Sequence, residues 1–312
     1  MRGTILPLLA LLAAAPVPAV AQQADPEAPP PVLAIGRQQL KPGKLNAHEK
    51  LSTAFTALFA KASPDTNWLG LEPIAGDDNV VLFLSGYASF ADAEAQHMKA
   101  ESAMAQNVAL KTEMERLDSQ TGDLLNASQT AWFVYRPALS FHPPKMSDVA
   151  KSRLVSITTV RVKPGRIPDF LDYYKGLNAA REKANASWVT TAAYQSSLGT
   201  AGGTFVYFSF SKGMSDLDEA NAKADDRQKA VDAALGGEQV VKMRRELISE
   251  ILMEPPTTNL YFTSRSQSHP SSQFAAADPD FWNPKPAAPT GKALATKKEP
   301  AAAPTPAPAP KQ

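Results

Sequence analysis

The chain contains no cysteine among its 312 residues. Disulfide bonds, thiolate metal sites, redox cysteine pairs and cysteine nucleophiles are therefore excluded. The folded part must be stabilised by core packing alone. This is feasible because a chain of this length has room for about two domains of ordinary size.

An excess of charge of one sign is also absent, since 32 Lys and Arg face 31 Asp and Glu, for a formal net charge of +1. Nucleic-acid binders usually carry a basic field, so no nucleic-acid partner is expected.

Long apolar runs are scarce as well. The run at Ile5–Ala15 is about half of the ~20 residues that span a bilayer, so no transmembrane segment is expected.

Residues 1–21 have the pattern of a signal peptide. Arg2 supplies the positive charge, Ile5–Ala15 forms the apolar region, and Ala19-Val20-Ala21 matches a cleavage site. We expect cleavage near Ala21 and a periplasmic or secreted protein. The Pro-rich residues 22–31 then form a flexible leader.

Two segments of the chain are nearly alike: Val32–Lys44 (VLAIGRQQLKPGK) and Leu154–Arg166 (LVSITTVRVKPGR). Each predicts a strand that ends in a Pro-Gly turn and leads into a helix, because proline cannot donate to a strand ladder and glycine permits positive φ. A predicted hairpin follows in each half, with its first strand beginning near Trp68 or Trp188.

The similarity continues to a His-Pro pair near the end of each half, at His142 and His269. The offset between equivalent residues changes only slowly (188 − 68 = 120; 269 − 142 = 127). This pattern predicts a tandem duplication with two βαββαβ units, at residues 32–145 and 150–270.

The paired strand–KPG–helix segments and the Trp-headed hairpins resemble the dimeric α/β-barrel superfamily, which includes antibiotic-biosynthesis monooxygenases and NIPSNAP proteins. The resemblance covers about residues 32–269. It implies an α+β fold, in which two tandem ferredoxin-like units pack sheet to sheet as a pseudo-dimer within one chain. It also implies a pocket between a sheet and its helices.

The sequence contains no Ser-His-Asp, H-E-x-x-H or EF-hand pattern. The first functional hypothesis is therefore an exported, non-catalytic protein that binds a small apolar ligand or a partner in the cell envelope, without a cofactor. The alternative, implied by the resemblance, is a cofactor-free or haem-using monooxygenase-like enzyme.

Haem-degrading members of the superfamily pair a helix histidine with a nearby Trp and Asn. By this resemblance Trp68 and His97 are candidate cofactor-binding residues, with Asn67 and Asn79 in the same unit. The spacing departs from the family pattern, in which the Trp closely precedes the His. Without a cofactor, His97 is a polar residue on an Ala/Glu/Lys helix face.

Two further groups are candidates from the residues alone. His142 and His269 would meet as metal ligands only across a pseudo-twofold axis. They lack companion carboxylates, and the residue before a proline is restricted to extended backbone, so no metal site is expected. Trp188, Tyr194 and Tyr207 would either line an apolar pocket or serve as core aromatics.

The C-terminal part has two regions. Residues 271–282 carry aromatic anchors, and the DPDFW motif at Asp278–Trp282 resembles segments of secreted bacterial proteins. Residues 283–312 hold five Lys against Glu299, with mostly Pro and Ala between them. We expect a disordered basic tail that could contact an anionic cell envelope.

Overall fold

The computed structural model describes residues 25–284, except for the side chains of residues 238–241, so the signal peptide and nearly all of the tail lie outside the described residues. The fold is mixed α and β and is built on a closed, eight-stranded antiparallel barrel in the order β1-β3-β2-β8-β5-β7-β6-β4. The strands are β1 (Val32–Leu40), β2 (Trp68–Ala75), β3 (Val80–Tyr87), β4 (Leu125–Tyr135), β5 (Leu154–Arg161), β6 (Ala192–Leu198), β7 (Thr204–Ser211) and β8 (Thr257–His269).

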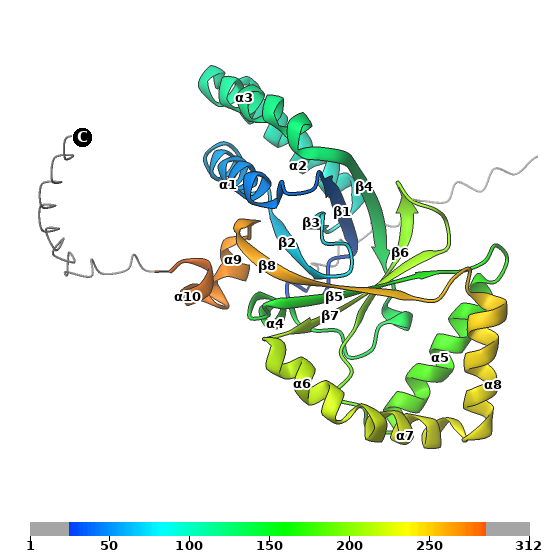
Figure 1. The fold of residues 1–312 in the computed structure, drawn as a ribbon. Helices are drawn as coiled ribbons and strands as arrows, with labels where there is room; N and C mark the ends of the chain where they lie inside the picture. The colour runs from blue at the N-terminus through cyan, green and yellow to red at the C-terminus, as the bar shows by residue number, and fades with distance from the viewer. Residues whose placement is uncertain (1–24, 285–312) are drawn as a thin grey trace, which may run out of the picture.

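Helices cover two opposite sides of the barrel (Figure 1), with α1–α3 on one side and α5–α8 on the other. The helices are α1 (Leu45–Ala62), α2 (Phe90–Ala105), α3 (Val108–Leu124), α4 (Met146–Ala150), α5 (Ile167–Lys183), α6 (Met214–Ala222), α7 (Ala224–Leu235), α8 (Glu238–Glu246), α9 (Ser272–Ala276) and α10 (Pro279–Trp282), with a 3₁₀ turn η1 (Pro137–Leu139) and a π-helical turn η2 (Leu247–Ile251). Within residues 25–284, none of the helices has the length and apolar character needed to span a bilayer.

Local sequence explains several element boundaries. Gly43 and Gly165 of the two KPG turns have φ values of 75° and 81°, in the left-handed region that glycine favours. Residues 106–107 separate α2 from α3, and the Asn107 side chain caps α3 by accepting a hydrogen bond from Leu110 N.

One boundary differs from the prediction. The strand start at Trp188 is wrong, because Trp188 lies in a turn and β6 begins at Ala192. β4 begins at Leu125, and its first residues pair with the end of β1. A break at Lys223 separates α6 from α7.

Two sets of four strands have the same relative order, β4-β1-β3-β2 and β8-β5-β7-β6. They join at two seams, where β2 pairs with β8 and β4 pairs with β6. Both seams contain register shifts. At the β2–β8 seam, Trp68 faces His269 but Gly70 faces Ser264, so extra residues of β8 bulge there.

All eight strands send alternate side chains into the barrel. This interior core includes Leu33, Leu71, Leu82, Phe133, Val155, Ala192, Val206 and Tyr261. The outer strand faces pack on helices in separate clusters, one with α1 and α3 around Leu51 and Leu117, and one with α5 and η2 around Phe170 and Phe205. Most of the apolar burial therefore belongs to one interior core and its two helical layers.

The β2–β8 seam requires a glycine at position 70. A Cβ atom there would lie 2.8 Å from Gln267 Cβ and 2.8 Å from the Gln267 carbonyl oxygen. We expect Gly70→Ala to lower the free energy of unfolding by about 1–3 kcal/mol, because the backbone of the seam must move. Gly36→Ala is the matched control, since its Cβ would lie 3.7 Å from Phe83, an ordinary contact. Urea denaturation of both variants tests this, and equal losses would contradict it.

Candidate functional site

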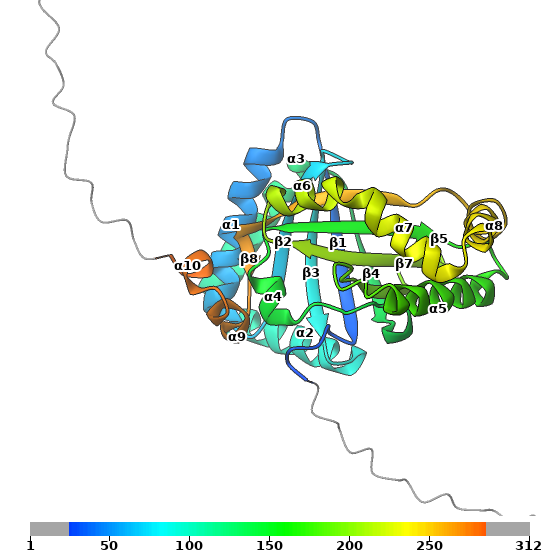
Figure 2. The same ribbon diagram turned by 90° about the horizontal axis from the view of Figure 1, so that it is seen from below.

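A cavity with a volume of about 560 Å³ lies inside one end of the barrel. Its inner wall consists of barrel residues such as Leu33, Leu84 and Phe208. Its outer wall is formed by the leader segment Asp25–Pro31 together with residues of α4 and α9. Figure 2 shows α4, α9 and the start of the described chain near one another. We call this space the leader cavity.

The leader segment is held in place by specific contacts. Glu27 accepts hydrogen bonds from Ser147 Oγ at 2.5 Å and Ser147 N at 3.2 Å, and its carbonyl oxygen accepts one from Met146 N at 3.0 Å. The Pro31 carbonyl oxygen accepts a bond from Tyr135 N at 2.9 Å. The leader therefore joins the first turn of α4 to the end of β4, and its prolines close the mouth of the barrel.

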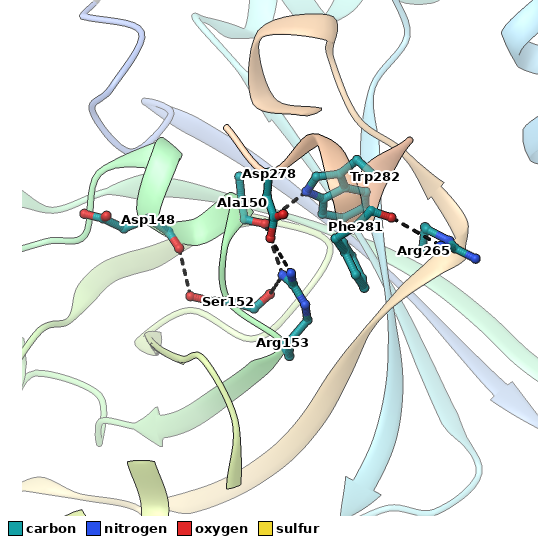
Figure 3. A network of polar contacts seen from close by, with 8 residues as sticks. All are labelled: Asp148, Ala150, Ser152, Arg153, Arg265, Asp278, Phe281 and Trp282. Atoms are coloured by element: carbon teal, nitrogen blue, oxygen red, sulfur yellow. Dashed lines mark hydrogen bonds and ion pairs between the residues drawn. The ribbon is translucent and has the colours of Figure 1, made fainter. Parts of the chain in front are cut away.

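The C-terminal segment, through Pro270, Ser271 and Phe274, supports the other side of the mouth. Arg153 binds Asp278 and lies over the Phe281 ring (Figure 3), with its guanidinium carbon 3.7 Å from the ring centroid. Trp282 donates a hydrogen bond from Nε1 to the Ala150 carbonyl oxygen at 3.0 Å. The DPDFW motif thus fastens α10 to the end of α4 and the start of β5, and so positions α9, which supplies Phe274 to the cavity wall.

The cavity wall is apolar and aromatic. Asp25 is its one charged residue among the described residues, and its aromatic side chains are Trp68, Tyr87, Tyr135, Tyr194, Phe208, Phe210 and Phe274. Burial raises the pKa of Tyr194 far above its ordinary value, and the neighbouring Tyr135 raises it further. The Tyr194 hydroxyl is therefore protonated at neutral pH and is available as a hydrogen-bond donor.

The structure brings some of the sequence-selected residues together. Trp68, Asn67 and Tyr194 all line the leader cavity, where Trp68 Nε1 donates to the Gln267 carbonyl oxygen at 2.7 Å. His97 does not line it. Its side chain on α2 is 74% exposed and lies 3.9 Å from Glu101.

The other two aromatic candidates also lie elsewhere. Tyr207 points to the opposite face of its strand, towards α5, where its ring stacks on Tyr174 with 5.0 Å between centroids. Trp188 packs beneath Arg227, in a cluster between α5 and α7. The leader cavity also differs from the expected pocket between a sheet and its helices, because it lies within the barrel.

The two histidines before prolines have separate environments. His142 approaches Glu182 at 3.1 Å, and its φ of 39° corrects the expectation of extended backbone. His269 Nδ1 donates to the Thr66 carbonyl oxygen at 2.5 Å, with its ring 5.2 Å from that of Trp68. Among residues 25–284, no group of three His, Cys, Asp or Glu is placed to hold a metal ion.

Sequence reasoning missed several residues of the wall, among them Tyr135, Tyr87, Met146, Phe274 and the leader prolines. The signal for Tyr135 was present, because it follows Ala131 and Phe133 at intervals of two in a strand with an apolar inner face. The leader prolines carried no such signal, since a Pro-rich segment is usually solvated.

A buried polar cluster lies between α1 and the β2–β8 seam. Glu72 accepts hydrogen bonds from Ser264 Oγ at 2.5 Å and from Gln267 Nε2 at 2.6 Å. His48, which is 2% exposed, donates from Nε2 to Gln38 Oε1 at 2.6 Å. Burial lowers the pKa of His48, and the charge of Glu72 opposes this shift only in part.

Because the pKa of His48 is lower in the folded chain than its ordinary 6.5, the unfolded chain takes up the proton first. We expect the free energy of unfolding to fall as the pH drops through and below 6.5. In His48→Gln this decrease should be smaller. His97→Gln is the control because His97 is exposed. Denaturant titrations from about pH 8 to pH 5 measure how the free energy of unfolding changes with pH. An identical pH dependence in His48→Gln and the wild type would show that His48 is not its source.

Comparisons with known proteins concern the fold. No protein-family profile and no curated protein matches the sequence. An anthrone oxidase-like protein is similar in structure, at 15% identity and a TM-score of 0.47 over 78% of this chain and 93% of that one. A mutant chlorite dismutase from Candidatus Nitrospira defluvii is similar at 9% identity and a TM-score of 0.42, over 80% of this chain and 97% of that one. A haem-binding protein from Thermus thermophilus is similar at 11% identity and a TM-score of 0.39, over 78% of this chain and 97% of that one. Since each TM-score is below 0.5, the site assignment rests on the geometry above.

Proposed function

We propose that this protein binds a small apolar molecule in the leader cavity. The observation that carries the proposal is the cavity itself: about 560 Å³ of space walled by aromatic, aliphatic and proline side chains. Ligand pockets typically have volumes of about 300–1,000 Å³ and a mostly apolar lining with a few polar groups. Asn67 and the tyrosine hydroxyls supply such polar groups here.

Binding without catalysis agrees better with this wall than the monooxygenase-like alternative. General base catalysis needs a titratable side chain close to the reacting atom. Asp25 is the one charged residue among the described lining residues, and it belongs to the leader at the cavity mouth. The wall offers no histidine to a haem iron, and His97 lies on the exposed face of α2. The residues present therefore do not fit haem at this site.

We further propose that the two strand sets arose by tandem duplication, with units at residues 32–145 and 150–270 that form a pseudo-dimer. The matching strand orders and the two KPG turns with positive φ support this origin. In this interpretation the β2–β8 and β4–β6 seams correspond to the interface of an ancestral dimer.

Occupation of the leader cavity can be tested with the neutral fluorescent probe N-phenyl-1-naphthylamine. We expect saturable binding by the full chain, and about tenfold weaker binding (~1.4 kcal/mol) after Leu69→Trp, because the larger side chain takes up cavity space. Leu198→Trp is the matched control, since Leu198 is exposed and lies outside the cavity wall. Equal binding by both variants, or no binding by the wild type, would refute the proposal.

Export and envelope contact are proposed from the sequence alone. Cleavage near Ala21 would leave residues 22–31 as the leader, and the basic tail at 283–312 would contact an anionic envelope. Mass spectrometry of the exported chain is expected to give an N-terminus near Gln22; retention of Met1 would contradict this.

Removing residues 283–312 is expected to reduce recovery of the protein in the envelope fraction, and unchanged recovery would eliminate the envelope as a partner of the tail.

A further inference from the structure

We propose that the leader cavity selects uncharged ligands that carry a carbonyl or similar acceptor oxygen, and that the hydroxyl groups of Tyr135 and Tyr194 bind this oxygen. The inference rests on the proposed function of the cavity and adds the chemical class of its ligand. Three features of the wall support it: the placement of the two tyrosines, the free hydrogen-bonding capacity of the Tyr194 hydroxyl, and the charge of the lining.

The two tyrosines form a cross-strand pair at one seam of the barrel. Tyr135 on β4 is opposite Tyr194 on β6, and their ring centroids are 5.4 Å apart. Both line the leader cavity. Because each strand is fixed by neighbours on both sides, the two rings are positioned before any ligand arrives.

The hydroxyl of Tyr194 has unused hydrogen-bonding capacity. The residue is 3% exposed, and its hydroxyl makes no hydrogen bond to another described residue, but it is not among the fully enclosed polar atoms that lack a partner, so it keeps access to the cavity. A buried polar group without a partner is costly. An apolar ligand that filled the cavity and displaced water would leave this donor unsatisfied, whereas a ligand with an acceptor oxygen would satisfy it.

The charge of the lining disfavours ligands with an anionic head group. The described wall contains no Lys, Arg or His, so a carboxylate or phosphate group would be buried without a cationic partner. Asp25 lies in the leader, where its Oδ1 accepts a hydrogen bond from Glu27 N at 2.9 Å. The wall therefore favours a neutral molecule with one acceptor group over a fatty acid or other amphiphilic anion.

The test compares two molecules that share one ring skeleton, 1-tetralone and tetralin, as competitors of N-phenyl-1-naphthylamine. The ketone is the more soluble in water, so the informative quantity is the change in affinity of each molecule on mutation. We expect Tyr194→Phe to weaken the binding of 1-tetralone by about three- to tenfold and to leave the affinity for tetralin unchanged. Tyr135→Phe is also expected to weaken the binding of 1-tetralone and not that of tetralin.

Tyr207→Phe is the matched control, because Tyr207 lies on the opposite face of the same hairpin and should change neither affinity. A third competitor, 1,2,3,4-tetrahydronaphthalene-1-carboxylate, tests charge and is expected to bind at least about tenfold more weakly than the ketone.

Equal weakening of ketone and hydrocarbon in Tyr194→Phe would indicate a packing role and would overturn the inference. Unchanged ketone binding, or a carboxylate that binds as tightly as the ketone, would overturn it too. In all these outcomes the probe still binds, so the proposed function survives. Failure of the probe to bind the wild-type chain would instead refute the proposed function itself.

Discussion

The structure depends on the pairing of sheet edges at two seams, β2 with β8 and β4 with β6. A four-stranded sheet with helices on one face leaves its other face bare and both outer strands unpaired. Joining two such sheets edge to edge removes all four open edges and turns both bare faces into one interior. This explains how a chain without disulfide bonds forms a cohesive structure: the interior core draws residues from every strand.

Closure also determines where a ligand site can arise. The middle of the barrel is filled by side chains, so free space remains at its ends, as in the leader cavity and in a smaller space of about 200 Å³ lined by Ile35, Arg37 and Tyr261. Which end holds a usable cavity is decided by the segments that cover it. The leader, α4 and α9 enclose one end with apolar side chains, and the Arg153–Asp278 contact fixes this cover. The tyrosine pair belongs to the β4–β6 seam and exists only when the barrel is closed.

Much of the secondary structure could be predicted from local patterns, and the candidate site only in part. The two KPG turns and the helices that follow them are signals of short range, so they were visible in the sequence. Tyr194 and Tyr207 looked equivalent. In the structure their rings lie on opposite faces of the sheet. The reason is the hairpin register, which pairs Tyr194 with Val206 and Ala193 with Tyr207. Trp68 and His97 likewise looked like partners, but one lies in the cavity and the other faces solvent.

By itself, the sequence determined the local elements, the absence of thiol chemistry and the likeness of the two halves, because propensity, turn chemistry and composition act over a few residues. Tertiary structure decided which strands meet at the seams, which face of each strand turns inward, and that a Pro-rich leader forms a cavity wall. Those outcomes follow from contacts between residues far apart in the chain, such as Tyr135 with Tyr194 and Glu27 with Ser147. Barrel closure establishes these contacts, and no local pattern encodes them.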